Sequence, residues 1–176
     1  MFKKTIFISF LTLSILFFPT VIHADQYYDQ YPGNGFIPKF ATSAYFRSFA
    51  GQLNHDDIYD EDYLCPVNFN VPDGSIYFIK SIGIRYKDNL TDGYLLVELR
   101  RRNLYTGAMH VVATWQSNYS GASSGEQTAS KGTEPGVKLV DTKKFAYWLT
   151  VYFSKDGDTN PSTQMELHQI RVHYGT

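Results

Sequence analysis

Two aromatic side chains within residues 145–153 are spaced for contact with a sugar chain. This segment reads FAYWLTVYF, and Trp148 and Tyr152 fall on the face opposite its apolar stripe. Side chains alternate between the faces of a strand, so at about 3.3 Å per residue the two rings lie about 13 Å apart on one face. An aromatic ring offers apolar area with a polar edge, and two rings in line can stack on successive sugars. The pattern predicts a carbohydrate platform of Trp148 and Tyr152, with Trp115 as a further candidate. The alternative is that neighbouring segments cover these rings.

A run of oxygen-bearing side chains follows that segment. Asp156, Asp158 and Asn160 stand at alternate positions and offer three ligands for calcium, which binds about six to eight oxygens. Asp, Gly and Asn are also the usual residues of a polar hairpin turn. The run is therefore a weak calcium candidate, and we expect no other cofactor.

Other reactive residues are scattered along the chain. The run Gly121–Gly125 matches the G-x-S-x-G nucleophile motif, but that motif needs a strand before it and a helix after it, and here it lies in a Gly/Ser-rich stretch. Cys65 is the only cysteine, and its alternation with apolar residues predicts a buried, inert thiol. Glu98 shares a strand face with Arg100 and Arg102, which predicts solvent-side ion pairing, with phosphate or sulfate capture by Arg100–Arg102 as the alternative. No catalytic set emerges, so we do not expect an enzyme.

The elements that position these residues are β-strands. Alternation of apolar and polar residues, interrupted by turns such as Pro72-Asp73-Gly74, recurs from residue 63 to the end of the chain, and no stretch has a helical period. A change of phase near His168 predicts a β-bulge. The expected strands are 36–40, 44–49, 63–71, 76–86, 94–102, 108–115, 145–153 and 164–174, with a weak edge strand at 126–130. Short connections favour antiparallel pairing, so the predicted fold is an all-β, jelly-roll-like antiparallel β-sandwich of about eight strands.

The N-terminus predicts the compartment. Lys3 and Lys4 precede an apolar run over residues 6–18, and the small Ala24 ends a short exit segment. This is the layout of a secretory signal peptide at 1–24, and the run is shorter than the roughly 20 residues of a membrane span. The polar, Tyr-rich residues 25–35 are expected to form a flexible leader, and residues 36–176 the β-sandwich domain. The protein is expected to be secreted or periplasmic.

Composition narrows the partners. Removing the two signal lysines from 16 basic residues leaves 14 against 17 acidic ones, a net charge of −3. This balance argues against nucleic acid and anionic membranes as partners, and we expect no membrane insertion.

Several strand sequences carry a resemblance. Val71–Gly74 before a long strand, Val97–Asn103 leading to the Thr106-Gly107 turn, the late strand Tyr147–Val151 and the terminal strand Ile170–Tyr174 resemble those of a group of small bacterial secreted proteins. The resemblance spans roughly residues 36–174. It implies a jelly-roll-type sandwich and carries no catalytic residue over to this chain.

Two functions are consistent with these observations. The first is an exported, non-catalytic module that binds a polysaccharide or a cell-surface glycan through Trp148, Tyr152 and Trp115. The second is a structural or adhesive extracellular subunit that self-associates through a sheet edge or through the leader at 25–35.

Overall fold

The computed structural model describes residues 26–39, 46–49, 52–55, 61–72, 75–119, 121–154 and 165–176. These residues form twelve strands and two 3-10 turns, and no α-helix occurs among them. The strands are β1 (Gln26–Pro32), β2 (Ile37–Pro38), β3 (Phe46–Phe49), β4 (Gln52–His55), β5 (Glu61–Val67), β6 (Tyr77–Asp88), β7 (Tyr94–Asn103), β8 (Met109–Gln116), β9 (Ser123–Gly132), β10 (Leu139–Val140), β11 (Phe145–Ser154) and β12 (Met165–Gly175). In the same ranges no helix has the length and apolarity needed to cross a membrane.

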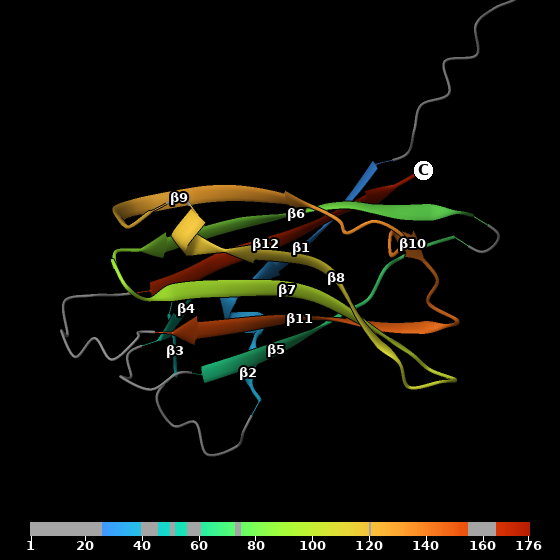
Figure 1. Cartoon of the computed structure of the whole chain (residues 1–176), viewed down its shortest axis with the longest axis horizontal. Coiled ribbons are helices and arrows are strands. Elements are labelled where there is room, and N and C mark those ends of the chain that lie inside the picture. Colours follow the sequence, from blue (N-terminus) through green and yellow to red (C-terminus); the bar gives the residue numbers. More distant parts are fainter. Residues whose placement is uncertain are drawn as a thin grey trace, which may run out of the picture.

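The strands form two antiparallel sheets. In the seven-stranded sheet β10, β6, β12, β4 and β3 follow one another, while β1 pairs with β12 and β9 with β6. The five-stranded sheet has the order β2, β5, β11, β7, β8. Figure 1 shows the long strands running along the molecule, with β10 and the β7–β8 hairpin at the same end. The predicted antiparallel, jelly-roll-like β-sandwich is confirmed, and β1, β4 and β10 are strands beyond those expected.

The core lies between the sheets and follows the predicted alternation. Along β11, Tyr147, Leu149, Val151 and Phe153 are buried, and they meet inward-facing residues of β6 and β12 in one cluster. Aromatic rings fill much of this space, because they bury large apolar area per residue. Ring pairs in the core include Tyr63–Phe153, Phe69–Tyr147, Phe69–Tyr174 and Tyr86–Trp115, with centroids 5.6, 5.0, 4.9 and 4.6 Å apart.

Two β-bulges interrupt the pairing of β12 with β6 in the seven-stranded sheet. The pairing of β12 with β6 shifts register between Leu167 and Gln169, which confirms the bulge predicted near His168. A second shift places Ser81 opposite His173 but Ile79 opposite Tyr174, so Lys80 is the extra residue. Because of this bulge, Tyr77 and Ile79 are buried and Phe78 is exposed. The sequence pattern places Ile76 and Phe78 on the inward face with Ile82, Ile84 and Tyr86, and Lys80 as the one misfit. This placement is confirmed for the last three apolar residues and is wrong for Ile76 and Phe78, which are exposed.

The flexible leader expected at residues 25–35 is wrong for most of its length. Gln26–Pro32 form β1, which pairs with β12 over seven residues, from Gln26 opposite Gly175 to Pro32 opposite Gln169. The tyrosines explain the difference, since aromatic residues favour strands even in a polar context. Tyr27 packs against Tyr77 and Tyr174 with ring centroids 5.4 and 5.6 Å apart.

A buried polar cluster closes one end of the sandwich. Asp88, at the end of β6, accepts a hydrogen bond from the Leu90 backbone N–H at 3.0 Å and one from the Ser117 hydroxyl. The Ser117 oxygen in turn accepts the Leu95 N–H at 2.8 Å. Burial raises the pKa of the Asp88 carboxyl, and the hydrogen bonds from Ser117 and Leu90 act in the opposite direction. This cluster fixes the start of β7 relative to β6.

Candidate functional site

The outer face of the five-stranded sheet carries a groove of about 430 Å³. Its floor comes from β11 and the two strands beside it, because residues paired across antiparallel strands share a face. Tyr152 lies between Asp62 and Leu96, Thr150 between Leu64 and Glu98, and Trp148 between Pro66 and Arg100. All of these except Pro66 line the groove, together with Lys39 and Met109.

Trp148 and Tyr152 stand on this face as the alternation predicts. Both are half-buried, with Thr150 between them, while the residues on either side along β11 point into the core. Tyr94 adds a third ring, whose centroid is 5.8 Å from that of Tyr152 and whose plane is tilted by 49° to it. Trp148 and Tyr152 are not buried in the core, and both line the same groove.

Ion pairs line the two sides of the groove. On the β5 side, the Lys39 ammonium lies 2.7 Å from Asp62 Oδ2. On the β7 side, Arg100 Nε donates to Glu98 Oε2 at 2.7 Å, and the Thr114 hydroxyl donates to Glu98 Oε1 at 3.3 Å. The solvent-side pairing predicted for Glu98 and Arg100 is therefore confirmed. Each of these carboxylates lies beside a cation, so the charges of the groove are paired. Polar atoms line both of its sides.

The groove residues outside the aromatic pair were not found from sequence. Leu64 and Leu96 give a signal in retrospect, since each is an apolar residue at an outward position of an alternating strand. Lys39 and Asp62 give none, because their contact depends on the pairing of Pro38 with Tyr63.

Trp115 is wrong as a member of the platform. It is only 4% exposed, and its ring packs 4.6 Å from Tyr86 of the opposite sheet. The cause is register, since Trp115 pairs with the inward-facing Val97. Sequence alternation could not set this phase, because Val111, Val112 and Ala113 are apolar in succession and β8 shifts register there.

The remaining sequence candidates do not join the groove. Ser123 opens the edge strand β9, with no helix after it, so the Gly121–Gly125 run lacks the context of a nucleophile motif. Cys65 is buried as predicted, and burial raises the pKa of its thiol. Asp156, Asp158 and Asn160 lie outside the described residues, and calcium binding there stays a prediction. Within the described ranges no three His, Cys, Asp or Glu side chains are grouped to hold a metal.

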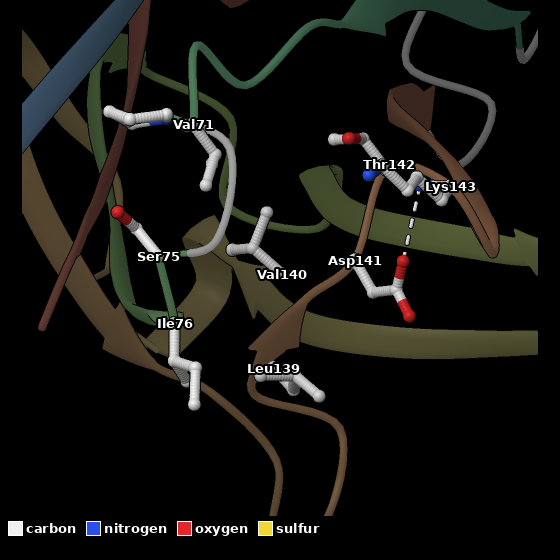
Figure 2. Close-up of a pocket in the computed structure, with 9 residues that line it drawn as sticks. Val71, Ser75, Ile76, Leu139, Val140, Asp141, Thr142 and Lys143 are labelled. Atoms are coloured by element: carbon white, nitrogen blue, oxygen red, sulfur yellow. Dashed lines mark hydrogen bonds between the residues drawn. The ribbon is translucent and has the colours of Figure 1, made fainter.

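A hollow of about 250 Å³ lies at the end of the sandwich, lined by residues 71, 72, 75 and 76 on one side and 139–143 on the other. Figure 2 shows the Asp141 carboxylate bonded within its own loop, where Oδ1 accepts the Lys143 N–H at 3.1 Å. The Tyr147 hydroxyl donates to the Leu139 carbonyl at 3.1 Å and holds this wall in place. The Asp141 carboxylate therefore stabilises its own loop, and we propose no catalytic or binding role for it.

No protein-family model matches the chain, and no curated protein matches it in sequence. Among solved structures, it is similar to a family 29 carbohydrate-binding module, with a TM-score of 0.45 and 9% identity over 85% of this chain and 89% of that one. It is also similar to the CBM22-1-GH10 modules of an endo-1,4-β-D-xylanase 10B from Clostridium thermocellum, solved with xylohexaose. There the TM-score is 0.45 and the identity 12%, over 85% of this chain and 28% of that one.

A third similar structure is a family two carbohydrate esterase from Cellvibrio japonicus, with a TM-score of 0.41 and 7% identity over 87% of this chain and 34% of that one. At such values these similarities carry no argument about function. The resemblance to small bacterial secreted proteins likewise remains an expectation.

Proposed function

We propose that this chain is an exported, non-catalytic carbohydrate-binding module that holds a glycan in the groove of the five-stranded sheet. The observation that carries the proposal is that Trp148 and Tyr152, four residues apart on β11, line one groove between two compensated ion pairs. Sugars present apolar C–H faces and hydroxyl edges. The aromatic rings fit the faces, and the charged side chains fit the edges.

The charge pairing selects the kind of glycan. Lys39 is compensated by Asp62 and Arg100 by Glu98, so an anionic sugar would compete for cations that are already engaged. A neutral polysaccharide needs only hydrogen bonds from these groups. We therefore propose a neutral glycan segment as the ligand.

The same pairing supports binding without chemistry. A glycosidase uses one carboxyl group as a proton donor and another as base or nucleophile. In this groove both carboxylates, Asp62 and Glu98, are already engaged in ion pairs with Lys39 and Arg100.

Assembly through the N-terminal leader is the weaker function. The leader was expected to be free to add a strand to a neighbouring molecule. Residues Gln26–Pro32 instead pair with β12 of the same chain, so this reason for proposing self-association is removed.

Affinity electrophoresis through gels that contain neutral polysaccharides tests the proposal. β-Glucan, mannan and xylan are tried in parallel, and at least one is expected to retard the wild-type protein. The Trp148→Ala/Tyr152→Ala double variant is expected to migrate as in a gel without polysaccharide. Tyr105→Ala is the matched control, because Tyr105 is an 80% exposed ring on the β7–β8 hairpin, outside the groove.

Two results would overturn the proposal. One is full retardation of the double variant, and the other is free migration of the wild-type protein in all three polysaccharides. Release of reducing ends from a retarding polysaccharide would contradict the non-catalytic part alone.

A further inference from the structure

The outer face of the seven-stranded sheet holds a separate hollow of about 230 Å³. Its lining includes Gly83 and Arg85 of β6, Thr128 of β9, and Gln169 and Arg171 of β12. None of these residues belongs to the groove described above. The volume is below the range of about 300–1,000 Å³ that holds drug-sized ligands, so the hollow suits a single small group.

A missing side chain creates this hollow. Gly83 pairs with Arg171 on one side and with Ser130 on the other, on the outward side of β6. A Cβ added at Gly83 would lie 3.9 Å from the Ala129 carbonyl oxygen and 3.9 Å from Arg171 Cβ, which is ordinary van der Waals contact. Gly83 is also not among the glycines with positive φ. Neither packing nor backbone conformation therefore requires glycine here, although glycine weakens a strand interior.

Arg171 supplies a positive charge that is not neutralised within the described residues. Its guanidinium lies over the ring of Tyr28, 5.6 Å from the centroid, and forms no hydrogen bond or ion pair there. Other cations of this face are engaged. Arg85 Nε lies 2.5 Å from Glu126 Oε1, and Lys87 Nζ lies 3.2 Å from Glu166 Oε1.

Arg85 lies near enough to Arg171 to add hydrogen bonds to the same ligand, although its own charge is paired with that of Glu126. Arg85 pairs with Gln169 and Gly83 with Arg171, so the two arginines are diagonal neighbours on adjacent strands, about 7–8 Å apart at the backbone. Long side chains bridge that separation. Arg85 contacts Glu126 through Nε, and its Nη groups form no other hydrogen bond in the described structure. Thr128 lies opposite Arg85 and adds a hydroxyl that has no hydrogen bond to any of the described residues.

We propose that this hollow binds the carboxylate or sulfate group of an acidic sugar, with Arg171 as the principal contact. Planar guanidinium groups match oxyanions through paired N–H donors. The space left by Gly83 takes the ring that carries the anion, and Thr128 donates to an oxygen of the ligand. The chain then has two distinct glycan sites, one on each sheet, for sugars of different charge.

Titration of the full chain with small probes, followed by amide chemical shifts, tests the proposal. The probes are sodium glucuronate, sodium sulfate and glucose, at low ionic strength because exposed charges are screened by salt. Glucuronate is expected to shift resonances of β6, β9 and β12 around Gly83 and to bind more tightly than sulfate. Glucose is expected to bind there at least tenfold more weakly.

Three variants locate the binding. Arg171→Gln removes the charge and Gly83→Val fills the hollow, and each is expected to weaken glucuronate binding at least tenfold. Arg102→Gln is the matched control, because it removes the same charge from an exposed position on the other sheet and is expected to bind like wild type. The spectra also report whether each variant is folded, and Arg171→Gln serves alone if Gly83→Val disrupts the sheet.

The outcomes separate the explanations. Equal binding of glucose overturns the role of charge, and equal or tighter binding of sulfate means an inorganic oxyanion only and overturns the sugar assignment. Unchanged binding in Arg171→Gln overturns the site. Trp148→Ala should leave this titration unaltered, so a failure here and a failure of the neutral-glycan groove are distinguishable.

Discussion

The outer faces of the two sheets cover the same core, but their charged side chains are paired on one face and partly unpaired on the other. On the five-stranded sheet, Arg100 is held by Glu98 and Lys39 by Asp62, and aromatic rings occupy the space between these pairs. On the seven-stranded sheet, Arg171 has no carboxylate partner among the described residues, and the hollow beside it is made by a glycine.

Charge pairing on a sheet face indicates which kind of ligand that face can bind. A groove with aromatic walls and paired charges is suited to a neutral ligand. An anion would have to lose its water of hydration there, and the cations, already paired with carboxylates, offer little attraction in return. An uncompensated guanidinium beside a vacant position is suited to an anion. Variants of the shared core and of each face test whether the two faces bind independently of each other.

The largest effect is expected from a change in the shared core. Leu149 is fully buried and lies on β11 between Trp148 and Thr150, facing away from the groove. Leu149→Ala should lower the free energy of unfolding by about 2–5 kcal/mol, because it removes apolar contacts and leaves a cavity. Urea denaturation measures this loss.

Without denaturant and at low temperature, the folded fraction of Leu149→Ala should still bind ligand at both faces, with the same ratio of affinities as wild type. A loss at one face with retention at the other would mean that the core distinguishes between them. That result would show that the two faces depend differently on the core beneath them.

The core is also the part that sequence predicts best. Alternation alone placed Leu149, Val151 and Phe153 inside and Trp148 and Tyr152 outside, because the period of a strand fixes the face of each residue. It failed where the period is broken, as at the Lys80 bulge and at the apolar run before Trp115.

Only those site residues that lie on the same strand could be related to each other from the sequence. Trp148 and Tyr152 share β11, so local spacing relates them. Lys39, Asp62 and Leu96 join them through pairings between distant segments, which local alternation does not determine. The hollow at Gly83 was missed for the same reason, since Arg171 is 88 residues away in the chain and meets Gly83 only by register.

A second substitution would make the two faces more alike by leaving an arginine unpaired on each. Glu98→Gln removes the partner of Arg100 while keeping an oxygen to accept the Thr114 hydroxyl. The free energy of unfolding should change by about 1 kcal/mol, because the Arg100 side chain is 39% exposed and the new amide keeps an acceptor at the mostly buried position 98. The released guanidinium should give the groove a weak, salt-sensitive affinity for sulfate that the wild-type groove lacks, measured by amide shifts on β7 and β11. An unchanged groove would show that pairing is not what excludes anions there.

The smallest effect concerns pH and contrasts an exposed carboxylate with a buried one. The hydrogen bond from Arg85 lowers the pKa of Glu126 below its ordinary value of 4.5, and His168 acts in the same direction. Glu126 therefore contributes stability above pH 4.5 that is lost as the pH falls through its folded-state pKa. Burial raises the pKa of Asp88 above 3.8, so its contribution has the opposite sign and stability falls as the pH rises from 3.8 through the folded-state value.

Thermal melting of the wild type, Glu126→Gln and Asp88→Asn between about pH 3 and 6 separates the two groups. Glu126→Gln should lose stability relative to wild type mainly at the upper end of this range. Asp88→Asn should instead gain relative to wild type as the pH rises. Salt at about 0.5 M should suppress the Glu126 difference, because it screens exposed charges, and leave the Asp88 difference largely intact. Equal salt sensitivity of both differences would mean that Asp88 is open to solvent in the folded protein, and that the end of β6 is less firmly closed than its hydrogen bonds indicate.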